Sequence, residues 1–236
     1  MKKTFRLLRM ATLMGLIMAG AFTLPLTVYA DDKAEAAQLI EKAKLTFQNF
    51  MTDPSMGVMR DLMKDAKGVF IMPQLLRGAY VIGISGGSGV LFSREGKSKW
   101  KGPAFYTVGG AGIGLQIGGE SSEVILLIMT ERGVTAFLSD NFKLGGDADV
   151  ALGPVGMGIA AQTANLSGDI LSFSRSKGLY GGVSLQGAVV ASREGMNSAY
   201  YSEKTISPAD ILIRAKDTTN PRAVGLREAI AKAAEK

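Results

Sequence analysis

The chain has 236 residues, with 27 lysines and arginines, 21 aspartates and glutamates, and neither histidine nor cysteine. The missing residue types exclude disulfides, an anchor on a lipidated cysteine, and catalytic or metal sites that depend on a histidine or a thiolate. Nothing in the sequence resembles the basic stripe with interleaved aromatic residues that marks a nucleic-acid-binding protein. We therefore expect a protein without nucleic-acid partner, metal or other cofactor.

Residues 1–30 have the layout of a secretory signal peptide. Four basic residues within the first nine positions precede an uncharged apolar run, which ends at Val28-Tyr29-Ala30. This pattern predicts export to the periplasm or cell envelope, with cleavage after Ala30. An uncleaved membrane anchor is the alternative, because about 20 apolar residues can just span a bilayer. The remaining 206 residues (236 − 30) hold 23 basic and 21 acidic side chains, so the mature chain is nearly neutral and has the length of one domain.

An amphipathic helix is predicted between Ala34 and Met51, where apolar residues recur at three-and-four spacing. Basic residues lie beside this apolar side, an arrangement that favours an anionic bilayer surface. We therefore predict lipid head-group contacts for Lys42 and Lys44. The apolar contacts are predicted for Leu39, Ile40, Phe47 and Phe50.

A second helix is predicted to begin at Asp53-Pro54, which have the residue types of an N-cap and a first-turn proline. Its apolar side is rich in methionine, at Met56, Met59 and Met63. Methionine side chains adapt to irregular partners. This face is therefore expected either to pack on the core or to dock a partner protein.

From Gly68 the pattern changes to short apolar runs between glycines, which predicts strands. We expect strands at Val69–Met72, Tyr80–Ile84 and Val90–Ser93, a turn at Gly86–Gly89, and an exposed charged hairpin loop from Arg94 to Lys101. Gly83–Gly87 matches the G-x-S-x-G pattern of a hydrolase nucleophile, but no histidine is present to accept the serine proton. No catalytic residue is predicted.

Two further segments, 103–118 and 151–161, alternate apolar residues with glycine. Glycine weakens a strand, so its repeated use needs a reason. One reason is a strongly curved or partly closed sheet with closely packed helices, and the other is a smooth groove for an acyl chain. Val124–Met129 is apolar on both sides, as in a buried central strand, and a short helix is predicted at Glu131–Ser139.

The segments Ile170–Ser174 and Gly182–Ser192 are predicted to form a hairpin with a charged end. Arg175 and Lys177 lie there on the same side as Phe173, so they could present two donors to one phosphate. A solvated hairpin end is the alternative. The acidic residues Glu120, Glu123, Asp147 and Asp149 lack the rest of a calcium loop and are expected to be polar edge groups.

Helices are predicted again at the carboxyl end of the chain. Ser207-Pro208-Ala209-Asp210 has the pattern of a capping box with proline at the first helical position, and Asn220-Pro221 starts another helix.

Leu171–Gly187, reading LSFSRSKGLYGGVSLQG, resembles the signature of the SYLF family. Further blocks in the same order support this resemblance, which covers roughly Ala34 to Ile213: Lys67–Pro73, Pro103–Phe105, Gly114–Gly118, Phe142–Gly145, Asp147–Gly156 and Asn197–Tyr201. The resemblance implies lipid binding, particularly of phosphoinositides in eukaryotic members, actin binding in some members, and no enzymatic activity.

Together these observations predict an α+β fold in which helices at both ends flank a curved, glycine-rich antiparallel sheet, either open or partly closed into a barrel. The expected organisation is a signal peptide at 1–30, a SYLF-like domain at 31–214 and a helical tail at 215–236. The expected function is that of an exported, non-enzymatic protein that binds anionic phospholipid or phosphoinositide-like head groups at a membrane surface. The alternative is a structural or protein-interaction module of the envelope that docks a partner through its methionine-rich helices.

Overall fold

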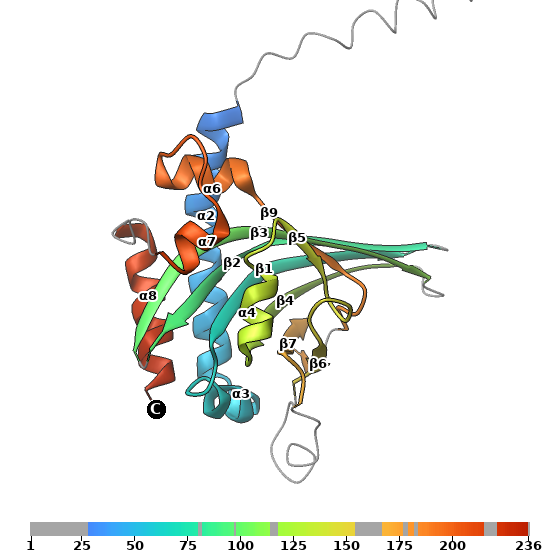
Figure 1. Ribbon diagram of the computed structural model, residues 1–236. Coiled ribbons are helices and arrows are strands. Elements are labelled where there is room, and N and C mark those ends of the chain that lie inside the picture. Colours follow the sequence, from blue (N-terminus) through green and yellow to red (C-terminus); the bar gives the residue numbers. More distant parts are fainter. Residues whose placement is uncertain are drawn as a thin grey trace, which may run out of the picture.

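A strongly curled, largely antiparallel sheet forms the centre of the molecule (Figure 1). The computed structural model describes residues 28–79, 82–96, 98–113, 118–153, 167–176, 179–181, 184–214 and 221–235. The strands are β1 (Gly68–Ala79), β2 (Ile82–Glu95), β3 (Lys99–Ile113), β4 (Gly118–Ile128), β5 (Asn141–Lys143), β6 (Val150–Leu152), β7 (Ile170–Ser176), β8 (Leu179–Gly181) and β9 (Val189–Ser192).

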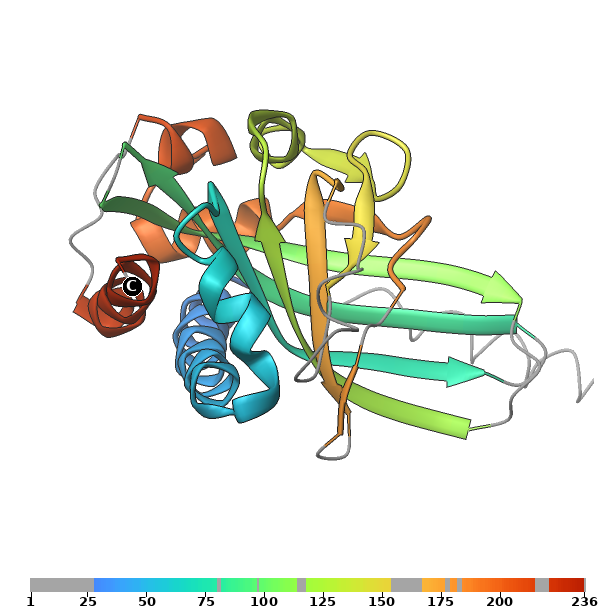
Figure 2. The ribbon, with the colours of Figure 1, turned by 90° about the horizontal axis from the view of Figure 1, so that it is seen from below.

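The sheet order is β5-β9-β3-β2-β1-β4-β7-β6, with β8 paired to β7, and of these pairs only β6 with β7 is parallel. No ladder joins β5 to β6 among the described strands, so the sheet curls as an open half-barrel. The long strands β1 to β4 project beyond the helices (Figure 2). The predicted α+β class with a curved antiparallel sheet and helices at both ends is confirmed.

Helices cover both faces of the sheet. On one face lie α2 (Val28–Thr52), the 3-10 turn η1 (Pro54–Met56), α3 (Gly57–Leu62), α6 (Glu194–Tyr201) and α8 (Pro221–Ala234). The other face is covered by α4 (Glu131–Ala136) and α7 (Pro208–Leu212), together with β5 and the segment that precedes β9. None of the described helices is both long and apolar enough to cross a bilayer.

Side chains cap three helix starts, and two of these caps, at Asp53 and Ser207, are predicted from the sequence. The Asp53 carboxylate accepts a hydrogen bond from the Ser55 amide at 2.8 Å, and Ser207 and Asp210 form the expected capping box. Thr130 caps α4 by accepting from the Gly133 amide at 3.1 Å. Each cap satisfies backbone donors that the first helical turn leaves without partners.

Alternation along the strands sends side chains into two separate cores. Val69, Ile71 and Phe92 point toward α2 and α8, whereas Phe70 and Met72 point toward α4 and β5. Residues 124–128 of β4 are all fully buried. This confirms the prediction of a central strand buried on both sides.

The predicted turn at Gly86–Gly89 is wrong, because β2 continues through it, paired with β3 throughout and with β1 on both sides of a register shift at Gly89. Close packing explains two of these glycines: a Cβ at Gly87 would lie 2.7 Å from the Met72 sulfur, and one at Gly89 would lie 2.7 Å from the Ile71 carbonyl oxygen. Glycine here permits the close approach of side chains and neighbouring backbone, and the chain does not reverse.

Two further expectations about strands need correction. Residues 170–192 do not form one hairpin, because β7 pairs with β4, β6 and β8, whereas β9 crosses to the other side of the sheet and pairs with β3 and β5. The β2–β3 hairpin exists and its tip is exposed at Glu95, Gly96, Ser98 and Lys99, but the loop is not exposed throughout: Trp100 and Lys101 are 4% and 6% exposed. The Lys101 ammonium donates to Glu95 and to the Ile213 carbonyl, and these acceptors compensate for its burial.

The carboxyl-terminal helix belongs to the same packed unit as the residues before it. Ala223, Leu226, Ile230 and Ala234 of α8 are buried in the core that also holds α2 and β1. The segment 215–236, expected as a tail, therefore supplies part of the domain core through α8.

Candidate functional site

The α2–α8 seam is the surface where these two helices run side by side in the same direction (Figure 1). It brings together Lys42 and Lys44 of α2 with Arg222 and Lys232 of α8. Two hollows lie along it. We name them the upper hollow and the lower cleft, and their residues follow below.

The upper hollow has a volume of about 470 Å³ and lies near the amino terminus of α8. Its lining residues are Ala37, Gln38, Glu41, Lys42 and Arg222. Lys42 and Arg222 are both exposed. The amino-terminal end of a helix carries partial positive charge, so the α8 terminus adds to the attraction of these two cations for an anion.

The lower cleft has a volume of about 430 Å³ and lies between the carboxyl-terminal ends of α2 and α8 and the last turn of α3. Its lining residues are Phe47, Gln48, Met51, Thr52, Arg60, Asp61, Ala229, Lys232 and Ala233. The cleft therefore combines apolar side chains with two cations and one carboxylate. Between the hollows Lys44 lies against α8, because a Cβ at Gly225 would be 3.2 Å from the Lys44 ammonium.

The apolar residues expected to contact lipid lie in the core. Leu39 is 9% exposed, and Ile40, Phe47 and Phe50 are at most 1% exposed. They hold α2 onto the sheet, so in this fold they offer no continuous apolar face to a membrane. Leu45, which lies off the apolar stripe and was missed in the sequence, is a large apolar side chain that α2 exposes, at 61%.

Arg175, the other anion-binding candidate, is engaged within the molecule. Its guanidinium pairs with Glu123, with Nε donating to the carboxylate at 2.5 Å, and the Thr46 hydroxyl of α2 donates to the same carboxylate at 2.8 Å. The three side chains tie β7, β4 and α2 together. Lys177 lies outside the described residues.

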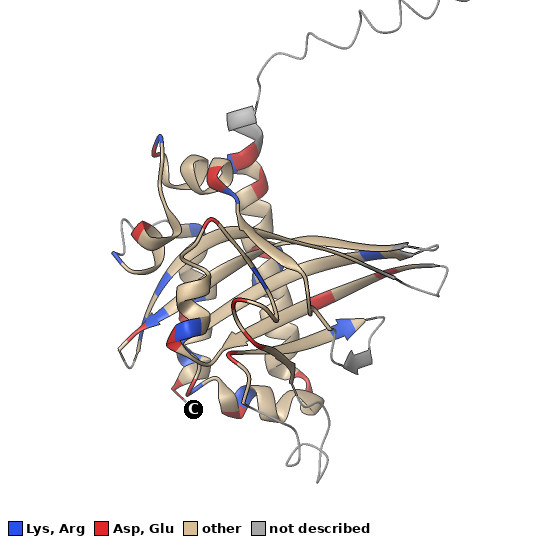
Figure 3. Cartoon of the chain, turned by 45° about the vertical axis from the view of Figure 1, so that its right-hand side comes forward, with Lys and Arg blue, Asp and Glu red and all other residues tan. Residues whose placement is uncertain are grey.

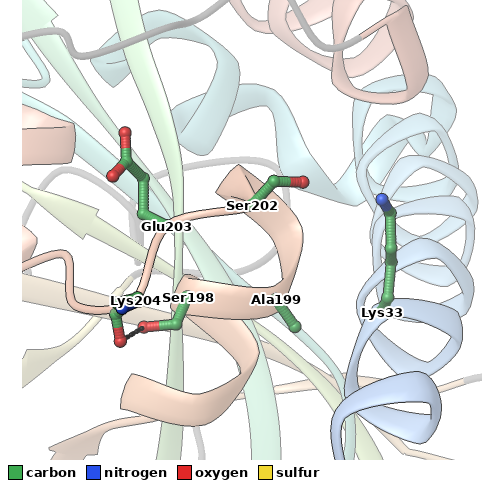
Figure 4. A pocket seen from close by; sticks show the side chains of 6 residues that line it. All are labelled: Lys33, Ser198, Ala199, Ser202, Glu203 and Lys204. Carbon is green, nitrogen blue, oxygen red and sulfur yellow. Dashed lines mark hydrogen bonds between the residues drawn. The ribbon is translucent and has the colours of Figure 1, made fainter.

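A third hollow, of about 380 Å³, lies beside α6 and combines charges of both signs. Lys33 comes from α2, and the other lining residues are Ser198, Ala199, Ser202, Glu203 and Lys204 (Figure 4). The Ser198 hydroxyl donates to the Lys204 carbonyl at 3.4 Å. No histidine is present to activate a serine in this hollow.

The shifted ionisable groups have structural causes. The hydrogen bond from Arg193 lowers the pKa of Glu35, and this pair joins α6 to α2. Burial opposes ionisation of Asp169, but hydrogen bonds from Thr130 and the Asp149 amide hold its pKa below the usual value. Burial raises the pKa of the Tyr106 hydroxyl. Within the described residues, no three acidic side chains gather as a metal site.

Charged side chains gather over the helices, and the projecting ends of β1 to β4 carry few of them (Figure 3). The sequence agrees, because residues 78–93 and 102–119 contain no charged side chain. Among the described surfaces, the α2–α8 seam therefore combines exposed cations with concave shape, and we take it as the candidate site.

Comparison with known proteins supports the resemblance of the sequence blocks. Residues 109–233 match the family model described as "Ysc84: Las17-binding protein actin regulator". The human SH3 domain-containing YSC84-like protein 1 is 30% identical over 200 residues, which cover 84% of this chain and 56% of that protein. The mouse protein of the same name is 28% identical over 191 residues, covering 80% and 55%.

A budding-yeast relative, LAS seventeen-binding protein 3, is 30% identical over 147 residues, covering 61% of this chain and 32% of that protein. The chain spans about half the length of the mammalian relatives. The matched region of the family model includes all but the last residue of α8, in agreement with its place in the core. On this evidence the chain belongs to the Ysc84 family, the family of the SYLF domain.

Proposed function

We propose that this protein is an exported, non-enzymatic lipid-binding protein that attaches to anionic phospholipid surfaces through the α2–α8 seam. The observation that carries the proposal is the upper hollow, where Lys42, Arg222 and the amino terminus of α8 converge on one exposed concave surface. Lys44 and Lys232 extend the positive charge along the seam. Leu45 supplies an exposed apolar side chain beside them.

The expected attraction is electrostatic at first contact. Each Lys or Arg held near an anionic membrane surface contributes about 1 kcal/mol, and salt screens this attraction. The buried residues Ile40 and Phe50 are not needed for it, so α2 can remain packed on the sheet. Binding is therefore expected to keep the fold intact.

Flotation with vesicles tests the proposal. The mature protein should float with vesicles of phosphatidylcholine and phosphatidylglycerol, or with phosphoinositide, and should stay behind with phosphatidylcholine alone. The double variant Lys42→Glu and Arg222→Glu should lower the partition constant by at least about 30-fold at low salt, since two favourable charges are lost. A double variant with the same charge change elsewhere, Lys143→Glu and Lys204→Glu, is the control. Equal flotation of the two double variants would contradict the proposal.

Export is proposed from the leader sequence. Its test is the mass and first residue of the protein recovered from the cell envelope, which should begin at Asp31. Recovery of the uncut chain would instead support the membrane anchor.

A protein partner is the second candidate function, favoured by the comparisons. The matching family model is described as a Las17-binding actin regulator, and the relatives carry SH3 domains or a Las17-binding name. The methionines expected to dock a partner are fully buried at Met56, Met59 and Met63, so docking would use the seam around Leu45 instead. Capture of a partner that persists in 1 M salt, where the Debye length is roughly 3 Å, would favour this function over lipid attachment.

A further inference from the structure

The lower cleft has the composition of a site for an amphiphile with one acyl chain. Phe47 and Met51 of α2 face Ala229 and Ala233 of α8 across it, and the small alanines leave the space between the helices open. Its volume of about 430 Å³ lies in the lower part of the range of small-molecule sites, roughly 300 to 1,000 Å³. This size suits one chain better than the two chains of a phospholipid.

The rim of the cleft carries two cations in different settings. Arg60 donates to the carbonyl oxygens of Met51 and Asp53, which fixes its guanidinium at the carboxyl end of α2. Lys232 lies in the last turn of α8 and is exposed. Lys232 is thus exposed at the mouth of the cleft, and Arg60 is held at the rim by its backbone acceptors.

The net charge at this rim is only weakly positive. Carboxyl-terminal helix ends carry partial negative charge, which offsets part of the positive charge of Arg60 and Lys232. The Asp61 carboxylate also lines the cleft and adds negative charge. A polyphosphorylated head group would find too few free cations here. A single carboxylate on a long apolar chain matches both the charge and the apolar lining.

We propose that the lower cleft binds a long-chain fatty acid, with the acyl chain between α2 and α8 and the carboxylate beside Lys232 and Arg60. The inference deepens the proposed lipid function, on which it rests, by adding a site for a monomeric lipid. It differs from vesicle attachment at the upper hollow, because it needs no bilayer. Fatty-acid binding in the lower cleft and vesicle attachment at the upper hollow can therefore be tested, and contradicted, independently.

Binding of cis-parinaric acid below its micellar concentration tests the inference. This fluorescent fatty acid accepts energy from tryptophan, and Trp100 is the single tryptophan of the chain. Saturable binding of one molecule to the mature protein is expected, with displacement by palmitate. Displacement by a soluble inositol phosphate, without displacement by palmitate, would overturn the inference.

Variants locate the bound acid. Ala229→Leu together with Ala233→Leu should fill the cleft and lower the affinity for parinaric acid at least about tenfold. The control is Ala231→Leu, on the same helix and outside the cleft, which should change this affinity by no more than about twofold. Lys232→Gln should weaken it about two- to fivefold. Circular dichroism melts establish that the variants fold.

Unchanged binding by the folded, filled variant would overturn the inference, even if that variant still floats with anionic vesicles. Parinaric acid binding by a protein that does not float would instead leave the inference standing and contradict the proposed function.

Discussion

Replacing Phe50 by alanine separates the two roles that α2 could have, core helix or membrane-contacting helix. Phe50 is fully buried against the sheet. Truncation of a buried phenylalanine costs about 3–5 kcal/mol, through lost burial and the cavity left behind. Since native domains are stable by about 5–15 kcal/mol, the Phe50→Ala variant should lose a large part of its stability.

Urea unfolding and thermal melts measure this loss. For a chain of this size, 1 kcal/mol shifts the melting temperature by about 2–4 °C, so a decrease of roughly 6–20 °C is expected. The control is Leu45→Ala on the same helix, whose side chain is 61% exposed, with an expected change within about 0.5 kcal/mol.

Vesicle flotation of the same two variants completes the test. At a temperature where it is folded, Phe50→Ala should float like the parent protein, whereas Leu45→Ala should float less. The opposite result, an unchanged stability and a loss of flotation in Phe50→Ala, would refute the reasoning and show that the apolar side of α2 meets the membrane.

Three further predictions address the contacts that hold the helices and strands. Asn197→Ala should lower the free energy of unfolding, measured in urea, by about 2–4 kcal/mol. The buried Asn197 amide accepts a hydrogen bond from the Phe105 N–H of β3 and donates one to the Phe105 carbonyl. Arg193→Gln should destabilise by about 1 kcal/mol at pH 7. The Arg193 contact lowers the pKa of Glu35 in the folded protein, so the ion pair stabilises the fold above the ordinary Glu35 pKa of 4.5. The difference in melting temperature between the variant and the parent protein should therefore shrink as the pH falls below 4.5. Gly89→Ala should cost about 1–3 kcal/mol through overpacking, whereas Gly78→Ala, where a Cβ meets nothing within 4 Å, should not lower the melting temperature.

The glycine-rich strands show how far sequence reasoning reaches. Residues 154–161 of the second glycine-rich segment lie outside the described residues. The glycine pattern of segment 103–118 predicts a strand, and β3 (Lys99–Ile113) forms its first part. The pattern does not distinguish Gly87 and Gly89, which adjoin other residues closely, from Gly78, which adjoins open space. That difference depends on which residues of β1 lie opposite, and pairing between strands is a tertiary property.

The candidate site was only partly visible in the sequence. Lys42 and Lys44 were recognised as basic residues beside an apolar helical stripe, and both lie on the seam. Arg222 and Lys232 were missed, because they follow α2 by about 180 residues and acquire their role only when α8 packs beside it. Leu45 was missed because a residue off the apolar stripe gives no periodic signal.

The sequence by itself determined the α+β class, the amphipathic helix, the caps at Asp53 and Ser207 and the family, because these depend on local periodicity, local hydrogen bonds and ordered motifs. Only the tertiary structure decided what covers each apolar surface. The stripe on α2 has the same pattern whether its partner is a sheet or a bilayer, and in this fold the partner is the sheet. Likewise, Arg175 is basic in any context, but the sheet register places Glu123 opposite it and makes the pair a link between strands.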